Sequence, residues 1–114
     1  MLPRRWQDRL RHIVAAAEEI LSFTACMDLE AFAADPRTQK AVLADFAIIG
    51  EAARHLPDEV CDAHPDIPWQ DMRDMRNFVV HVYFSVEPAV VWDTIRNDLP
   101  GLAQALRALV TESE

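Results

Sequence analysis

Apolar residues recur every three or four positions through most of this 114-residue chain. This is the spacing that places side chains on one face of an α-helix. The clearest run contains Trp6, Leu10, Ile13, Val14, Ala17, Ile20 and Leu21. The chain has only two glycines and is rich in alanine, leucine, glutamate and arginine, which favours helix over sheet. The sequence therefore predicts an all-α protein.

Capping residues divide the first half of the chain into separate helices. Asp28 is suited to cap a short helix over residues 29–34. Asp35 followed by Pro36 is a strong start signal, because the carboxylate caps the helix and proline suits its first position. We expect the helix that starts there to reach about His55.

Prolines divide the second half. We expect helical segments over about residues 58–63, 69–84 and 87–110. Pro100 lies inside the last segment, and it lacks the backbone N–H that a helix interior needs. We therefore expect a kink between residues 97 and 101. Together these segments predict one domain, residues 1–114, folded as an antiparallel bundle of four main helices plus short ones.

The overall charge and the cysteines exclude several kinds of protein. The net charge of −8 argues against a broad nucleic-acid-binding surface, although it leaves room for a small basic site. No apolar run approaches the roughly 20 residues that cross a bilayer, and no signal peptide is evident, so we expect a cytoplasmic protein. Cys26 and Cys61 lie far apart and are expected to be buried thiols, without a zinc site or disulfide.

Polar residues are concentrated in one helix-sized stretch, "RDMRNFVVHVYF", residues 73–84. On a helix, Arg73, Asn77 and His81 would form one polar stripe, because they are spaced i, i+4 and i+8. Arg76 lies about 140° around the helix from His81 and falls beside this stripe. A two-fold dimer could still bring copies of this pair together.

These residue types are suited to metal-free RNA cleavage. Histidine exchanges protons near neutral pH, and arginine matches the geometry and charge of phosphate. No acidic cluster with metal-ligand spacing is evident. A hydrogen-bonded structural role for His81 is the commoner outcome for such spacing, however, and Asn77 and Tyr83 could equally serve packing.

Gly50 is an unusual residue for the middle of a predicted helix, where it costs about 1 kcal/mol relative to alanine. Its expected use is the close approach of another helix or of a dimer partner. Glu51, Arg54 and His55 next to it are expected to form a solvated face.

The stretch also carries a family motif. Arg76, four residues, His81, one residue and Tyr83 resemble the Arg-x4-His-x-Tyr motif of HepT-like toxins, a branch of the HEPN ribonuclease superfamily. Asn77 fits as well, because HEPN motifs commonly have a polar residue directly after the arginine. The segments "FAADPRTQKAVLADFAIIGEAARHLP" and "VVWDTIRNDLPGLAQAL" are similar to the family's central and closing helices, so the resemblance covers about residues 8–108.

The resemblance implies a HEPN fold and a homodimer in which Arg76 and His81 of both subunits line a cleft at the interface. Arg73 and Asn77 would support this site. The implied activity is metal-independent endoribonuclease cleavage, as the toxin of a type II-like toxin–antitoxin system. No cofactor of the chain itself is implied.

The resemblance also implies a partner, an antitoxin that is a minimal nucleotidyltransferase of the MntA type. Such an antitoxin would use ATP to AMPylate Tyr83, and the bulky, charged adduct would block phosphate from His81. The alternative is a non-catalytic HEPN-like domain that dimerises and docks to a nucleotidyltransferase, which the acidic composition favours. A third reading, a cofactor-binding bundle using His81 and Met75, lacks the paired Glu-x-x-His motifs of such bundles.

Overall fold

The computed structural model describes residues 5–77 and 87–113. Its regular elements are α1 (Trp6–Thr24), α2 (Leu29–Ala33), α3 (Pro36–Arg54), α4 (Asp58–Ala63), α5 (Trp69–Asp74), α7 (Pro88–Asp93), the π-helical segment η1 (Thr94–Asp98) and α8 (Leu99–Ser113). Within these two ranges there is no strand, so the prediction of an all-α fold is confirmed.

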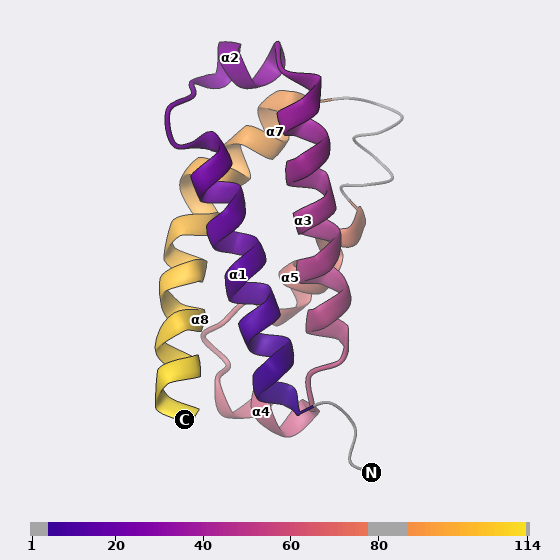
Figure 1. Cartoon of the computed structure of the whole chain (residues 1–114). Coiled ribbons are helices and arrows are strands. Elements are labelled where there is room, and N and C mark those ends of the chain that lie inside the picture. Colours follow the sequence, from indigo (N-terminus) through magenta and orange to yellow (C-terminus); the bar gives the residue numbers. More distant parts are fainter. Residues whose placement is uncertain (1–4, 78–86, 114) are drawn as a thin grey trace.

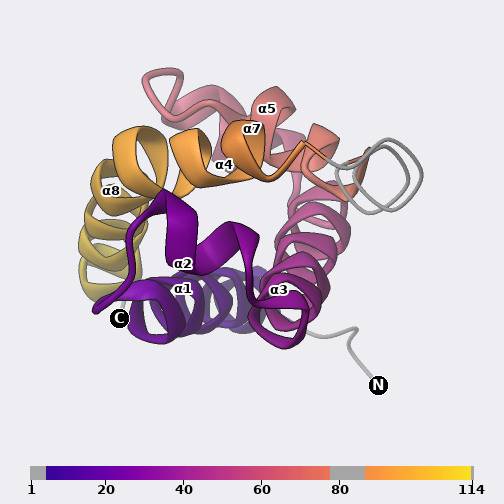
Figure 2. The same cartoon turned by 90° about the horizontal axis from the view of Figure 1, so that it is seen from above.

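The long helices α1 and α3 lie side by side and run in opposite directions (Figure 1). Helix α8 packs along another side of α1, and α2 covers one end of the bundle, where it contacts α7. Viewed from above, α5 and α7 lie across the core from α1 (Figure 2). The C-terminal part of α3 contacts α5, and this contact carries the residues of interest below.

The core is formed by the apolar faces that the periodicity predicts. The largest fully buried side chains are Phe32, Phe46, Leu10, Ile13, Ile20, Ile49, Met72, Ile95, Leu99, Leu106, Val42 and Val91. The ring of Phe32 in α2 packs against that of Trp92 in α7, with 5.3 Å between centroids. This contact packs α2, which covers the end of the bundle, against α7.

The two predicted capping aspartates occupy the predicted positions. Asp28 accepts a hydrogen bond from the Ala31 N–H at 2.8 Å. Asp35 accepts one from the Thr38 N–H at 3.0 Å, and Pro36 is the first residue of α3. Side-chain oxygens thus satisfy N–H groups that a helix start leaves without a backbone partner.

Pro100 distorts the last helical region, as expected, but the distortion begins earlier than residues 97–101. The segment η1 widens to π-helical bonding over Thr94–Asp98, and the α-helix resumes at Leu99. Because Pro100 has no N–H to donate to the carbonyl of Arg96, the regular ladder cannot pass through this turn.

The predicted continuous helix over residues 69–84 is wrong at its centre. Helix α5 ends at Asp74, and the Met75 N–H bonds to the Met72 carbonyl, three residues back, at 3.1 Å. This tighter turn separates α5 from Arg76 and Asn77, which are again helical. Residues 78–84 lie outside the described residues.

One carboxyl group is buried between α1 and α3. Asp45 is 4% exposed, and its Oδ2 has no hydrogen-bond partner among the described atoms. Burial, and then the neighbouring Glu19, raise the pKa of Asp45 to about 7. Asp45 therefore holds a proton at pH values where an exposed aspartate has lost it.

Two smaller expectations have different outcomes. Cys61 is buried as predicted, whereas Cys26 is exposed, because it follows the end of α1 in a turn and not a packed helix face. No helix in the described ranges is both long and apolar enough to span a membrane.

Candidate active site

Arg73 holds α5 against two other elements. Its Nε donates to the Ala53 carbonyl at 3.4 Å, and its Nη2 lies 3.4 Å from the Cys61 sulfur. Ala53 is in the last turn of α3, and its carbonyl also accepts from the Leu56 N–H at 3.3 Å, so Arg73 adds a side-chain hydrogen bond to this helix end. Burial raises the pKa of the Cys61 thiol, and the charge of Arg73 opposes this only in part, so the thiol stays protonated at neutral pH.

Gly50 allows the backbone of Arg76 to lie directly against α3. A Cβ atom at Gly50 would lie 2.8 Å from the Arg76 nitrogen, 3.0 Å from the Arg76 Cβ and 3.2 Å from the Arg73 carbonyl oxygen. Real Cβ atoms essentially never come within 3.0 Å of another heavy atom, and two of these neighbours are backbone atoms that cannot swing away. The expectation of a close helix approach at Gly50 is therefore confirmed, with the segment that carries Arg76 as its neighbour.

Glu51 is the ionic partner of Arg76. Arg76 Nη1 lies 3.6 Å from Glu51 Oε1, while Glu51 Oε2 lies 3.0 Å from His55 Nε2. The hydrogen bond with His55 and then the charge of Arg76 lower the pKa of Glu51, and partial burial opposes them. Glu51 and His55 are exposed as expected, but the sequence did not indicate the contact of Glu51 with Arg76.

Arg76 itself remains accessible, with 56% of its side chain exposed. It is thus held in position by its backbone contact and by one exposed carboxylate, while much of its guanidinium faces solvent.

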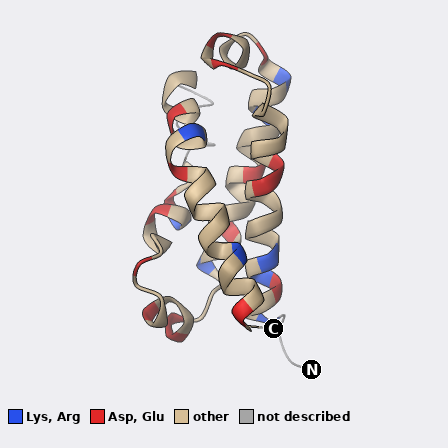
Figure 3. Cartoon of the chain, turned by 90° about the vertical axis from the view of Figure 1, so that its left-hand side faces the viewer, with Lys and Arg blue, Asp and Glu red and all other residues tan. Residues whose placement is uncertain are grey.

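Arg73 and Arg76 line the same depression, which has a volume of about 480 Å³. Its lining residues are Arg54, Gln70, Arg73, Asp74, Arg76 and Asn77. Three arginines against one aspartate give this depression a positive charge, although acidic positions are spread along the side of the molecule shown in Figure 3. We call it the arginine depression.

The structure therefore brings Arg73, Asn77 and Arg76 together. Arg76 was expected beside the stripe because of its angle to His81, which lies outside the described residues, but it lines the same depression as Arg73 and Asn77. Arg54 joins them from α3. No local pattern predicts this, since Arg54 and Arg76 are 22 positions apart and come together only through the contact between α3 and the α5 segment.

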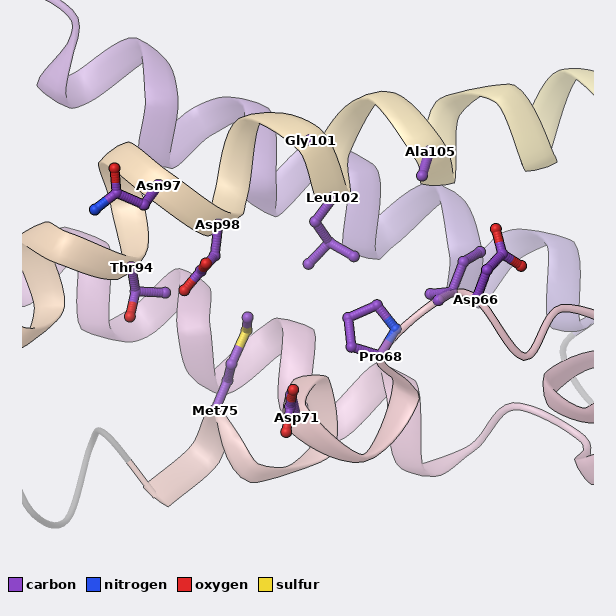
Figure 4. Close-up of a pocket in the computed structure, with 11 residues that line it drawn as sticks. Asp66, Pro68, Asp71, Met75, Thr94, Asn97, Asp98, Gly101, Leu102 and Ala105 are labelled. Atoms are coloured by element: carbon purple, nitrogen blue, oxygen red, sulfur yellow. The ribbon is translucent and has the colours of Figure 1, made fainter.

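A second depression, of about 500 Å³, lies between α5 and the closing helices (Figure 4). Asp71 of α5 and Met75, just after that helix, face Asp98 and Leu102 across it, and Asp66 lies at its end. Its carboxylates would repel a phosphate, so it is an unsuitable place for nucleic acid. We call it the acidic groove.

His81 and Tyr83 lie outside the described residues, so their predicted roles stay predictions. Within residues 5–77 and 87–113, no three His, Cys, Asp or Glu side chains are grouped so that they could hold a metal ion.

Comparison with known protein families shows which family the chain belongs to. The family model for ribonuclease HepT-like proteins matches residues 13–109. The chain belongs to the HepT-like ribonuclease family. The match includes α3, α5 and the arginine depression between them, so these are parts of the HepT-like domain itself.

Individual relatives agree with this assignment. The chain is 40% identical over 101 residues to "Probable ribonuclease HepT" of Thermococcus cleftensis, an alignment that covers 89% of this chain and 92% of the relative. It is 30% identical over 105 residues to "Putative RNase MJ0127" of Methanocaldococcus jannaschii, covering 92% and 87% of the two chains. No solved structure matches the HepT-like chain.

Proposed function

We propose that this HepT-like protein is a metal-independent endoribonuclease, the toxin of a type II-like toxin–antitoxin system, with Arg76 and His81 as its catalytic residues. The observation that carries the proposal is the arginine depression. In a chain with a net charge of −8, three arginines surround one depression, and Arg76 lies in it with its side chain more than half exposed. The relatives named as ribonucleases support the same activity.

In the proposed mechanism His81 moves protons and Arg76 stabilises charge. His81 assists the 2′-hydroxyl of RNA in attacking the adjacent phosphate, or protonates the leaving oxygen. Arg76 stabilises the negative charge that develops on the phosphate. The phosphate would take the place of the Glu51 carboxylate, whose contact with Arg76 is exposed and therefore easily exchanged.

The proposed site is shared between two subunits of a homodimer, so that Arg76 and His81 of both copies face one RNA strand. Asn77 and Arg73 have supporting roles. Asn77 is exposed in the arginine depression, and Arg73 fixes α5 against the end of α3.

The proposed regulation acts on Tyr83. An antitoxin of the minimal nucleotidyltransferase (MntA) type would transfer AMP from ATP to this hydroxyl, which adds negative charge and bulk two residues from His81. The HepT-like chain itself needs no cofactor in this scheme.

The activity is tested with the purified protein, a single-stranded RNA and excess EDTA. We expect cleavage by the wild type, and rates lower by about 100-fold or more for His81→Ala and Arg76→Ala, since each removes a group that acts in the transition state. Arg37→Ala is the matched control, because Arg37 is an exposed arginine in the first turn of α3, far along the chain from the depression. Cleavage by a folded His81→Ala protein at the wild-type rate would falsify the catalytic proposal.

The regulation is tested by co-expression with a minimal nucleotidyltransferase of the MntA type. The intact mass should rise by one or more AMP units in the wild type and stay unchanged in Tyr83→Phe. A mass shift that persists in Tyr83→Phe would place the modification on another residue.

A second candidate function is a non-catalytic partner that dimerises and docks to a nucleotidyltransferase. The acidic groove favours it, because an exposed groove lined by Asp66, Asp71 and Asp98 suits a basic partner surface. Expression of the isolated chain distinguishes the two functions. Growth arrest that depends on His81 supports the toxin, and harmless expression supports the docking protein.

A further inference from the structure

Arg54 is placed in the arginine depression without a strong partner of its own. It is the last residue of α3, it is exposed, and within the described ranges no hydrogen bond or ion pair holds its guanidinium. The charge of Glu51, one helical turn earlier, is the electrostatic neighbour that acts on it. An arginine in this position can turn toward an incoming anion at little cost.

The wall of the depression beside Arg54 is fixed. Arg73 donates to the carbonyl of Ala53, the residue that precedes Arg54, and so anchors the backbone from which the Arg54 side chain extends. On the opposite wall, the Gln70 amide donates to Asp74 at 3.0 Å. Asp74 is the acidic lining residue, and this hydrogen bond engages one of its oxygens.

Arg54 and Arg76 therefore offer positive charge from two different elements, α3 and the segment after α5, around one open depression. A single strand of nucleic acid carries one phosphate per nucleotide, so a strand that places one phosphate at Arg76 brings a neighbouring phosphate within reach of a nearby cation. Arginine is the side chain best suited to grip it, through paired N–H donors.

We propose that the arginine depression is a subsite for a backbone phosphate next to the one that is cleaved, with Arg54 as its principal ligand. This inference rests on the proposed ribonuclease function and names how the substrate is held. Arg54 is a binding residue and takes no part in the proton transfers. Its loss should raise KM and leave kcat almost unchanged.

The test separates binding from cleavage by using two RNAs. Binding is measured by fluorescence anisotropy with a single-stranded RNA whose 2′-hydroxyls are methylated, since this probe retains its phosphates and lacks the attacking group. Cleavage is measured with the unmodified RNA of the same sequence. The proteins are the wild type, Arg54→Ala, Arg54→Lys and Arg37→Ala.

Arg54→Ala and Arg37→Ala are matched in charge, because both take the net charge from −8 to −9 by removing an exposed arginine from α3. We expect Arg54→Ala to bind the methylated RNA about tenfold more weakly, as the loss of one charged hydrogen-bonded contact predicts. In a plot of the logarithm of the association constant against the logarithm of the salt concentration, the slope should become less steep by about 0.7, the value for one phosphate contact on a single strand. Arg37→Ala should bind like the wild type, and Arg54→Lys should bind with an affinity between those of Arg54→Ala and the wild type, because it keeps the charge but lacks the paired N–H donors.

The outcomes are distinguishable from one another. If the wild type cleaves RNA but Arg54→Ala and Arg37→Ala bind the methylated probe equally well, the subsite is overturned and the ribonuclease proposal stands. If the wild type cleaves nothing, yet Arg54→Ala selectively loses affinity and salt dependence, the phosphate subsite stands and the catalytic proposal fails. A fall in kcat with unchanged KM in Arg54→Ala would also overturn the inference, because it would make Arg54 part of the chemistry.

Discussion

The arginine depression and the acidic groove lie against different faces of α5, have similar volumes of about 480 and 500 Å³, and carry opposite charge. The arginine depression collects Arg54 from α3 and Arg73 and Arg76 from the α5 segment. The acidic groove collects Asp71 from α5, Asp66 from the loop before it, and Asp98 from η1. The net charge of −8 has the same sign as the charge of the acidic groove and the opposite sign to that of the arginine depression.

The two regions also differ in how closely their walls approach. On the arginine side, Gly50 lets the backbone of Arg76 touch α3, so there is no room for even one more carbon atom. On the acidic side, a Cβ added at Gly101 would have nothing within 4 Å. The arginine side is therefore closely packed, as the proposed catalytic role of Arg76 would require, whereas the acidic groove is open.

Exchanging the two glycines for alanine should give the largest contrast. Gly50→Ala removes a helix-weakening residue but forces the Arg76 backbone away, so we expect a net loss of about 1–3 kcal/mol in the free energy of unfolding. RNA cleavage should fall by about 100-fold, because a displacement near 1 Å at a catalytic residue has that cost. Gly101→Ala should be neutral, or stabilise α8 by up to about 1 kcal/mol. Urea unfolding and cleavage assays on the two variants measure this, and equal behaviour would show that the close contact at Gly50 is not needed.

A second contrast is between the exposed charges of the two depressions and the buried carboxyl group of Asp45, for which we predict a pH-dependent effect on stability. Its pKa of about 7 in the folded chain lies above the ordinary value of 3.8, so its contribution to stability is full below about pH 4 and is lost as pH rises through about 7. Replacing it by asparagine removes this dependence. We expect Asp45→Asn to gain on the order of 2 kcal/mol over the wild type at pH 8 and little at pH 4, less than the full shift would give, because the depression beside Asp45 and Glu19 is open to water.

Urea unfolding of the wild type and Asp45→Asn at pH 4, 6 and 8 checks this pH dependence. Parallel curves for the two proteins would contradict a protonated Asp45. The relative rates of RNA cleavage by these two proteins should stay equal wherever both are folded, since Asp45 is not among the residues that line the arginine depression.

The third contrast lies within the arginine depression, between two arginines three positions apart. Arg73→Met should lower the free energy of unfolding by about 1–2 kcal/mol, because α5 loses the charged hydrogen bond that joins it to the Ala53 carbonyl of α3. Arg76→Met should leave the thermal midpoint unchanged, because its contact with Glu51 is exposed, and should abolish cleavage instead. Thermal unfolding and cleavage rates of both variants test this division, and a stability loss in Arg76→Met as large as that in Arg73→Met would contradict it.

The smallest effect is expected from neutralising the acidic groove. Asp71→Asn combined with Asp98→Asn should strengthen binding of single-stranded RNA by only about two- to threefold at low salt, through long-range charge alone. The gain should disappear at about 0.5 M salt. Anisotropy titrations at both salt concentrations measure it, and a gain that persists in high salt would mean that RNA contacts the groove directly.

Much of the fold followed from the sequence, because its signals are local. Asp28, Asp35 and Pro36 start their helices where capping chemistry requires it, and the periodic apolar residues became the core. The expectations that failed depended on contacts between distant segments. The turn at Met75 interrupts a stretch whose helical periodicity is unbroken. Cys26 was expected to be buried as a small apolar residue, but it is exposed because it lies in the turn after α1.

The candidate site shows the same division. Residue types and their intervals were enough to predict a helical protein and a close approach at Gly50, and to show that Arg76 and His81 have the spacing of the family motif. Three features came from the packing of the helices: the segment that approaches Gly50, the pairing of Glu51 with Arg76, and the position of Arg54 beside Arg73 and Arg76 in one depression. The physical reason is that the sign of the charge at a site depends on which helix faces meet, and the packing of α3 on α5 brings together residues that no local pattern connects.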